Sequence, residues 1–299
     1  MACRGKVLGR AGGLVVVDCR RCGFAHLSPR PSLESQEELY AHFWSQEIPW
    51  YVEHVDEDLA WRHAAYGRLF SRVERMLAQQ SELSLFDIGC GLGDLLQHVT
   101  SRPKWRDCVG IDPDPRAREA AKRFGPVFSR IPDWRVHCVS MLMVIEHVLD
   151  PEKSLREAHG ALSPGGVLVL SVPNDFNRLQ RRLTRGRSPW WIHRHHVNYF
   201  TPESLQALLE KTGFSVEYRT TTFPMELFLL FGDYTQDRKK GRRVHKIRKW
   251  LDRLGCWVLY PWMAKYGWGR HLVVLAKKRV DLSVAVKSQE SQVLQGDGS

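Results

Sequence analysis

The sequence lacks the long apolar run that a membrane-spanning helix requires. Such a helix needs roughly 18–20 consecutive apolar residues, whereas the early run Leu14–Val17 is short and is followed at once by charged residues. The seven cysteines, an odd number, lack the spacing of a secreted disulfide framework, and no secretory leader is recognisable. These absences predict a cytoplasmic protein with reduced thiols.

Signatures of two other classes of protein are also missing. The glycine-rich loop at 89–93 has the spacing G-x-G-x-G, whereas a dinucleotide-binding loop has G-x-G-x-x-G, which argues against a nucleotide-dependent reductase. No RNA-binding module, target-base motif or internal repeat is recognisable. The formal net charge of +11 nevertheless favours anionic partners, whether nucleic acid, an acidic lipid surface or a phosphorylated substrate.

A buried strand, a tight turn and a helix are predicted around the glycine-rich loop. The apolar segment Leu85–Ile88 contains one acid, Asp87, and the glycines and a helical pattern follow it directly. Glycines suit a turn with unusual dihedral angles or a backbone that approaches a ligand closely. The pattern predicts a ligand site at the carboxyl edge of an open α/β sheet.

The charges around this loop favour a cationic ligand. Asp87 precedes the glycines and Asp94 follows them, and two acids would repel the pyrophosphate of a dinucleotide. S-adenosylmethionine carries an ammonium and a sulfonium group and no phosphate, so it fits the pattern. The alternative is a tight strand–helix turn that holds no ligand.

A second short strand supports the cofactor interpretation. The segment Cys108–Ile111 leads to Asp112, which lies 19 residues after Gly93. A carboxylate at the tip of the second strand can accept hydrogen bonds from both ribose hydroxyls, as the corresponding acid does in dinucleotide-binding folds. The same residue would also serve as the N-cap of the helix that follows.

With these segments the chain resembles the class I S-adenosylmethionine-dependent methyltransferases over roughly residues 15–225. Three further stretches match signatures of a broad bacterial small-molecule subgroup: Val144–Pro151 (EH-x-x-D-P), Leu162–Gly166 (L-x-P-G-G) and His196–Leu205 (H-x-N-[FY]-F-[ST]). The resemblance implies an α/β fold with a Rossmann-like, doubly wound and mostly parallel seven-stranded sheet, helices on both faces and an antiparallel last strand. It also implies S-adenosyl-L-methionine as the cofactor, held by Asp87, Gly89, Cys90, Gly91, Gly93, Asp112, Met143 and Glu146.

Two histidines are candidates for a base near the methyl acceptor. His147 follows the predicted strand Val136–Val144, and an unperturbed imidazole titrates near neutrality, although a structural histidine bonded to the backbone would fit equally. His196 matches the family's histidine before the N-[FY]-F turn. An oxygen acceptor would need such a base. His137 stands where relatives usually have Asp, a departure that either weakens the cofactor site or is neutral at the start of a strand.

The segment 176–200 is the predicted acceptor-side insertion. Arginine forks bind phosphate or carboxylate in bidentate fashion, and tryptophan faces stack on rings or sugars. The alternative is a solvated basic loop. The residues behind this expectation are Arg178, Arg181, Arg182, Arg185, Arg187, Trp190 and Trp191.

The opening segment carries a cysteine knuckle. Cys19 and Cys22 form a C-x-x-C-G pair with Cys3 upstream, and a zinc ribbon needs four ligands from two such knuckles. One possibility is a zinc ion bound by these cysteines with His26 or His42 as the fourth ligand. The other is a β-turn that carries surface thiols, and the incomplete set of cysteine ligands favours this second possibility. The aromatic residues that follow either form a lid over the cofactor or, as we favour, pack on the core: Tyr40, Phe43, Trp44, Trp50 and Tyr51.

The connection at 224–270, between the last two predicted strands, is unusually long. It begins apolar and continues with a cationic run from Arg238 to Lys249, followed by Trp250, Trp257, Tyr260, Trp262, Tyr266 and Trp268. We rank first an insertion that packs its aromatics on the core and leaves its charges in solvent. Second is peripheral contact of 238–268 with an anionic membrane, with a lipid-linked or glycan precursor as substrate. Nucleic acid would also suit the charges but is disfavoured.

The sequence therefore predicts four regions: an N-terminal segment 1–55, a methyltransferase core 56–223, the basic and aromatic insertion with the last strand 224–279, and a disordered tail 280–299. The predicted reaction is direct methyl transfer to a small-molecule, glycan or lipid-linked acceptor of anionic character. The protein would be cytoplasmic, at most peripheral to the inner face of the membrane. The alternatives are an RNA methyltransferase and a non-catalytic scaffold that binds S-adenosylmethionine.

Overall fold

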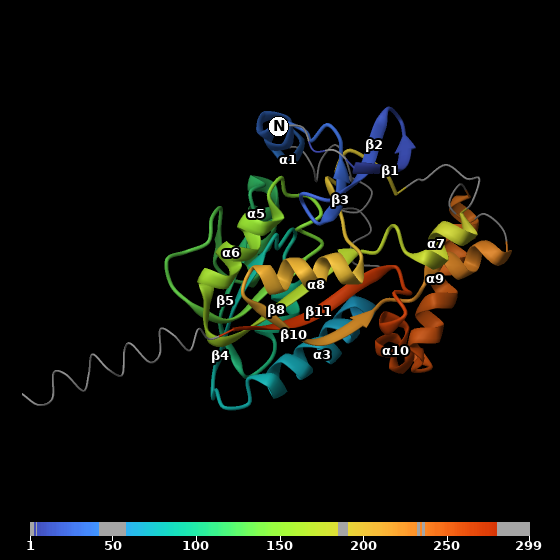
Figure 1. Ribbon diagram of the computed structural model, residues 1–299. Helices are drawn as coiled ribbons and strands as arrows, with labels where there is room; N and C mark the ends of the chain where they lie inside the picture. Colours follow the sequence, from blue (N-terminus) through green and yellow to red (C-terminus); the bar gives the residue numbers. More distant parts are fainter. Residues whose placement is uncertain are drawn as a thin grey trace, which may run out of the picture.

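A computed structural model describes Cys3 and residues 5–41, 58–184, 191–231, 234 and 237–279. The described chain forms one large sheet, a smaller sheet beside it and helices around both (Figure 1). Several residues named above lie outside the described ranges: His42, Phe43, Trp44, Trp50, Tyr51, Arg185, Arg187, Trp190 and the tail 280–299.

The large sheet has seven strands in the order β10-β11-β8-β7-β4-β5-β6. These are β4 (Leu83–Ile88), β5 (Trp105–Ile111), β6 (Val127–Phe128), β7 (Val136–Leu142), β8 (Leu162–Pro173), β10 (Phe214–Thr221) and β11 (His271–Lys278). Neighbouring strands from β8 to β6 are parallel, whereas β11 runs antiparallel to both β8 and β10. This arrangement confirms the predicted Rossmann-like sheet with an antiparallel last strand.

Side chains alternate between the two faces of the large sheet, as the two-residue period of a strand requires. In β4, Leu85 joins one apolar cluster and Phe86 joins the other. The first cluster includes residues of α3 (Leu59–Met76) and α4 (Asp94–Thr100), and the second includes residues of α6 (Pro151–Ala161) and α8 (Pro202–Lys211). Helices therefore cover both faces, and the carboxyl ends of the parallel strands share one edge.

Capping side chains set the starts of three helices near that edge. Asp114 accepts from the N–H of Arg116 at the start of α5 (Pro115–Ala121), and Asp150 caps α6 in the same way. Thr201 and Ser204 form a capping box at the start of α8. Each helix begins with proline, whose missing N–H costs nothing at that position.

The smaller sheet has the order β1-β2-β3-β9 and joins the opening segment to the rest of the chain. Its strands are β1 (Gly5–Ala11), β2 (Leu14–Cys19), β3 (Phe24–Leu27) and β9 (Asn198–Tyr199), and α1 (Leu33–Ala41) follows β3. Ala25 pairs with Tyr199, and His26 pairs with Asn198. The strand β9 immediately follows the predicted base His196, so the opening segment supports that part of the site.

The C-terminal insertion packs on the start of α3. It contains η4 (Met225–Phe231), α9 (Arg238–Arg253), η5 (Cys256–Leu259) and α10 (Tyr260–Lys265), and it lies with α7 (Arg178–Leu183) at one end of the molecule (Figure 1). Lys249 of α9 pairs with Asp58 at 2.6 Å, and Trp61 donates a hydrogen bond to Asp252 at 2.8 Å. The short helix η3 (Lys122–Phe124) completes the described elements.

Candidate active site

The glycine-rich loop follows β4 and needs glycine for both conformation and space. Gly89, Gly91 and Gly93 have positive φ angles of 72°, 52° and 86°, which residues with side chains rarely adopt. A Cβ on Gly89 would lie 2.5 Å from a methyl carbon of Val144, and one on Gly93 would lie 2.8 Å from the Phe124 ring. Larger residues would therefore displace the loop from its neighbours.

Two buried acids flank this loop. Asp112 accepts hydrogen bonds from the N–H groups of Gly91 and Asp114, both at 2.9 Å, and Asp87 accepts one from the Ser140 hydroxyl at 2.7 Å. Burial raises the pKa of Asp87 to about 7 despite the Ser140 hydrogen bond, and the nearby charge of Asp112 adds to the rise. Burial also raises the pKa of Asp112. A cation bound beside these acids would therefore stabilise their charged forms.

Two other residues of this stretch are engaged by the protein itself. Asp94 pairs with Arg62 at 2.5 Å and with His63 at 3.0 Å. The expectation that Asp94 adds negative charge for a ligand is therefore corrected, because α3 supplies its counter-charge. Cys90 packs its thiol in the apolar cluster on the α3–α4 face, and its N–H donates to the Ile111 carbonyl at 3.1 Å.

Beyond β7 the backbone takes a strained conformation that leads to a buried acid. Met143 has a φ of 59°, which is rare for a residue with a side chain. Glu146 is fully buried, and neither of its carboxylate oxygens has a hydrogen-bond partner within the described chain. Burial raises the pKa of Glu146 well above its usual value, and the charge of Asp175 adds to the rise. Glu146 is thus a buried acceptor that lacks a donor from the described residues.

Backbone hydrogen bonds join the segment around Glu146 to the H-x-N-Y-F motif. The Glu146 carbonyl accepts from the N–H groups of Val197 at 2.8 Å and Asn198 at 2.9 Å. The side-chain amide of Asn198 in turn donates to the carbonyls of Ile145 at 2.9 Å and Val148 at 2.6 Å. These bonds use the asparagine fully as a donor and make the two distant motifs one structural unit.

The two predicted bases meet at this junction. Nδ1 of His147 lies 2.8 Å from the His195 carbonyl, so Nδ1 carries the proton and Nε2 is left with the lone pair. That Nε2 lies 3.7 Å from Glu146. Burial lowers the pKa of His147 to about 3, and the neighbouring His196 strengthens the effect. His147 therefore has the backbone contact that a structural histidine would have, and its ring centre lies 5.1 Å from that of His196.

His196 faces an acid that the protein holds in its charged form. Nδ1 of His196 lies 3.3 Å from Asp175, whose other oxygen accepts a 2.5 Å hydrogen bond from Arg270. Burial opposes ionisation of Asp175, but Arg270 and His196 outweigh it and hold its pKa below the usual value. Arg270 also lies 3.8 Å from the buried Glu226. An imidazole oriented by a carboxylate at one nitrogen can present the other nitrogen as a base.

Arg270 and Glu226 were not among the predicted site residues. For Asp175 the sequence offers one signal, which is its position just beyond the carboxyl end of β8. Arg270 precedes β11, and the antiparallel register that places His271 opposite Pro173 brings Arg270 to the same edge. Because register between distant strands sets this contact, local sequence could not reveal it.

Other residues singled out in the sequence have structural surroundings. His137 lies near the start of β7, at the end of the strand opposite the carboxyl edge, and its Nδ1 is 2.9 Å from the Ser84 hydroxyl. Trp191 is 5% exposed and packs with Phe176 in the core of the smaller sheet, which contradicts a role as an acceptor platform. The ring of Tyr40 in α1 lies 6.0 Å from that of His147.

The donor set at the carboxyl edge fits the predicted cofactor. Asp87, Asp112 and Glu146 are buried acids whose pKa values are raised. A ligand with an ammonium group and ribose hydroxyls would supply both the charge and the donors that these acids lack, whereas a pyrophosphate would add repulsion. The predicted metal ligands Cys3, Cys19 and Cys22 lie elsewhere, in and beside the smaller sheet.

Comparison with known proteins defines the class. A family described as "Methyltransferase domain" matches residues 61–218, which is more than half of the chain. The chain therefore belongs to this methyltransferase family, and the predicted class, S-adenosylmethionine-dependent, is confirmed. No helix in the described ranges combines the length and apolar character needed to cross a membrane.

Two curated relatives are ubiquinone biosynthesis O-methyltransferases. That of Cereibacter sphaeroides is 30% identical over 155 residues, which cover 44% of this chain and 60% of the relative. That of Azorhizobium caulinodans is 30% identical over 173 residues, which cover 50% of this chain and 65% of the relative. The chain thus spans less than two thirds of the length of these relatives.

A solved structure supports the fold. The plantazolicin methyltransferase BpumL, in complex with SAH, superposes with a TM-score of 0.52 at 15% sequence identity. The match covers 83% of this chain and 96% of that protein. At this identity the likeness concerns the fold alone.

Proposed function

We propose that this chain transfers the methyl group of S-adenosylmethionine to a hydroxyl group of an acceptor held at an anionic membrane surface. The observation that carries the proposal is that two chemically different sets of side chains lie at the carboxyl edge of the large sheet. Asp87 and Asp112 there suit a cationic cofactor, and the pair formed by Asp175 and His196 suits removal of a proton. The names of the O-methyltransferase relatives support oxygen as the accepting atom.

In this proposal the loop and its acids hold the cofactor. Asp87 and the glycine-loop backbone bind the amino-acid end, and Asp112 binds the ribose hydroxyls with the lone pairs that its two backbone donors leave free. When bound, S-adenosylmethionine supplies a methyl group on a sulfonium that is already an activated leaving group. The remaining task of the chain is to align the acceptor oxygen with that methyl group.

His196 is the proposed catalytic base. Asp175 keeps the proton on Nδ1, so Nε2 takes the acceptor's proton and Asp175 then stabilises the imidazolium. Arg270 is a positioning residue, because it fixes Asp175 in its charged form. The three side chains therefore act as a unit that the acceptor approaches from the side of His196.

The membrane part of the proposal rests on exposed apolar side chains of the C-terminal insertion. Tyr260 is 7% exposed and packs on the core as the first-ranked expectation had it, but Trp250 and Tyr266 are each 57% exposed. We call the exposed set the C-terminal patch, and its apolar members are Ile247, Trp250, Leu254, Trp257, Val258, Leu259, Trp262, Tyr266 and Trp268. So many exposed aromatics exceed the scattered apolar residues of an ordinary surface.

The same patch is strongly cationic. Its exposed cations are Lys239, Lys240, Arg242, Arg243, Lys246, Arg253 and Lys265. Asp252 is the only acid between 238 and 268, and it is buried and hydrogen-bonded to Trp61 and Tyr260. Anionic lipid head groups attract such cations, while tryptophans and leucines enter the head-group boundary.

The helix α9 presents this patch without unfolding. Positions 243, 246, 247, 250 and 254 follow the three- and four-residue spacing of one helical face, and all five are exposed. The opposite face carries His245 and Lys249, which both pair with Asp58 before α3. The core therefore holds one side of α9 and leaves the other side free for a lipid surface.

Calorimetric titration tests the cofactor part. We expect the purified chain to bind S-adenosylmethionine and S-adenosylhomocysteine with micromolar affinity and not to bind NADH. The His196→Gln variant should bind the cofactor like the wild type, because His196 contacts the acceptor rather than the cofactor. Absence of S-adenosylmethionine binding in the wild type would overturn the proposal.

Transfer of radiolabelled methyl groups tests the reaction. Total membrane lipid extract and total RNA are offered as separate acceptor pools, and we expect label in the lipid pool that His196→Gln reduces by about a hundredfold. Label in RNA alone would contradict the acceptor class. Cofactor binding without label in either pool would favour the non-catalytic scaffold.

Vesicle sedimentation tests the membrane part. The wild type should bind vesicles that contain phosphatidylglycerol and not vesicles of phosphatidylcholine alone. Changing Arg242, Arg243 and Lys246 to Ala should weaken binding by about a hundredfold, at about 1 kcal/mol per cation. The matched control changes the exposed Arg116, Lys122 and Arg123 of α5 and η3 to Ala, which removes the same charge far from the C-terminal insertion (Figure 1). Equal losses in both variants would refute a specific patch.

A further inference from the structure

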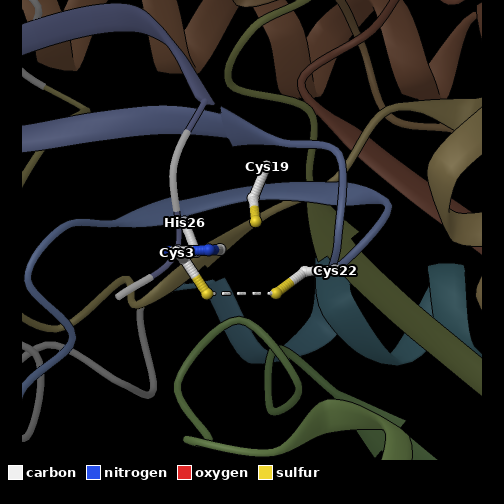
Figure 2. Close-up of side chains that lie close together, drawn as sticks. All are labelled: Cys3, Cys19, Cys22 and His26. Carbon is white, nitrogen blue, oxygen red and sulfur yellow. Dashed lines mark hydrogen bonds between the residues drawn. The ribbon is translucent and has the colours of Figure 1, made fainter. Parts of the chain in front are cut away.

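A second cluster of chemically reactive side chains lies apart from the methyl-transfer site. Cys3 precedes β1, Cys19 ends β2, Cys22 lies in the turn before β3, and His26 lies within β3. Figure 2 shows that the four side chains point toward a common centre. Their ligand atoms all lie within 4.8 Å of one another.

The spacing of these atoms fits a tetrahedral metal ion. Zinc binds cysteine sulfur at about 2.3 Å, so two sulfurs on a tetrahedron lie about 3.8 Å apart. The Sγ atoms of Cys3 and Cys22 lie 3.7 Å apart (Figure 2). The third cysteine, Cys19, is fully buried. Three sulfurs in this arrangement provide three of the four ligands that a structural zinc site requires.

His26 has the orientation of the fourth ligand. Its Nδ1 lies 2.7 Å from the Leu27 carbonyl, and a carbonyl can only accept, so Nδ1 carries the proton and Nε2 carries the lone pair. The side chain is fully buried, and Nε2 has no hydrogen-bond partner in the described chain. Zinc-binding histidines are oriented by this kind of backbone contact at the other ring nitrogen. The lone pair of Nε2 therefore lacks a partner that a metal ion would provide.

We propose that Cys3, Cys19, Cys22 and His26 bind a structural zinc ion. The incomplete cysteine pattern had favoured surface thiols, but Cys19 and His26 are buried and turn inward. In this proposal, Cys3 and His26 take the places of the two cysteines that the second knuckle of a four-cysteine ribbon would supply.

The proposed zinc ion would stabilise the strand that supports His196. His26 and Asn198 are paired in neighbouring strands, and Asn198 holds the carbonyls of Ile145 and Val148. Phe24 and Phe200 pack across the same junction with ring centres 5.2 Å apart. Metal binding at one end of β3 would therefore stabilise the contact between the smaller sheet and the acceptor side of the site.

Metal content of the full chain tests the proposal. Protein purified under reducing conditions should contain one equivalent of zinc, measured by mass spectrometry of the metals. Reconstitution with cobalt should give the visible absorption bands of a tetrahedral site with thiolate-to-cobalt charge transfer. The cobalt measurement uses the wild type, so it does not depend on the folding of a variant. Less than a tenth of an equivalent of zinc and no such bands after reconstitution would overturn the proposal.

Variants then assign the ligands. Cys22→Ser and His26→Ala should each lower zinc content at least tenfold after dialysis against a chelator, whereas His26→Cys should retain zinc and intensify the charge-transfer band, because a fourth sulfur replaces nitrogen. The matched control is Cys256→Ser, which removes a half-buried thiol from the distant C-terminal insertion. Zinc loss in the control, or full retention in His26→Ala, would contradict the assignment. These readouts are independent of cofactor binding and methyl transfer.

Discussion

Asp175 and Asp87 are both buried acids at one edge of the large sheet, yet their electrostatic surroundings are opposite. Asp175 faces Arg270 and His196, and these partners hold its pKa below the usual value despite burial. Asp87 faces the Ser140 hydroxyl and the like charge of Asp112, and burial raises its pKa to about 7. The protein therefore supplies a counter-charge to Asp175, whereas among the described residues Asp87 has only the Ser140 hydroxyl as a hydrogen-bond donor.

This difference separates the two halves of the candidate site. The acceptor half is completed by long-range contacts among side chains, so its geometry exists before any ligand arrives. The cofactor half keeps acids whose charged forms are unfavourable, so a cationic ligand would gain from each of them. Glu146 lies beside His147 and His196 but resembles Asp87, because burial raises its pKa as well.

The strongest test of the comparison is the stability of Asp175→Asn. This change takes the nearest carboxylate from the half-buried Arg270 and leaves it only Glu226 at 3.8 Å among the described acids, so we expect a loss of about 3–5 kcal/mol in the free energy of unfolding. Urea denaturation measures it. The double variant Asp175→Asn/Arg270→Met should recover part of the loss, since it removes the cation that has lost its nearest carboxylate. A loss below about 1 kcal/mol in the single variant would mean that the pair is not a structural unit.

The second test removes a ligand-facing charge. Asp112→Asn should weaken S-adenosylmethionine binding by about ten- to a hundredfold, because hydrogen bonds to charged groups contribute about 1.5–3 kcal/mol. Isothermal titration calorimetry measures the dissociation constant. Urea denaturation of the ligand-free variant is the control for folding, because the Asn amide can accept only one of the two backbone hydrogen bonds that Asp112 accepts. Wild-type affinity in Asp112→Asn would remove Asp112 from the cofactor site.

The third test uses pH. An aspartate ionises near pH 4 in the unfolded chain, whereas the pKa of Asp87 in the folded chain is about 7. A raised folded pKa disfavours the charged form, so the wild type loses stability as pH rises from about 4 to about 7. Asp87→Asn lacks this loss and should be more stable by roughly 4 kcal/mol above pH 7, at 1.36 kcal/mol for each of about three pKa units, with no difference near pH 4.

Urea denaturation at several pH values measures that difference. A stability gain that is equal at pH 4 and pH 8 would show that the effect of Asp87→Asn does not arise from ionisation. The same variant should bind S-adenosylmethionine less tightly even though it is more stable, which is the behaviour expected of a group reserved for a ligand.

The smallest expected effect concerns His137. Its ring contacts Ser84 near the amino ends of the strands, so His137→Ala should cost about 1 kcal/mol of stability for the lost hydrogen bond. Cofactor affinity should change less than twofold, because the carboxyl edge lies at the other end of β7. A large loss of affinity would instead support the view that this departure from the family pattern damages the cofactor site.

Local sequence determined the glycine-rich loop and the two acids that are proposed to bind the cofactor. The alternating glycines, the acids at 87 and 112 and the apolar strands before them act within a few residues of one another, and backbone dihedral preferences and strand burial fix their outcome. Asp94 shows the limit of this reasoning, because Arg62 from another helix supplies the counter-charge to an acid that the sequence predicted to face a ligand.

Only the tertiary structure decided the rest. The antiparallel register of β8 and β11 brings Arg270 to Asp175, and the pairing of β3 with β9 connects His26 to Asn198. The exposure of Trp250 also depends on which face of α9 packs on α3. Such contacts join residues that are far apart in the chain, and their partners are selected by sheet register and packing, which no local pattern of residues specifies.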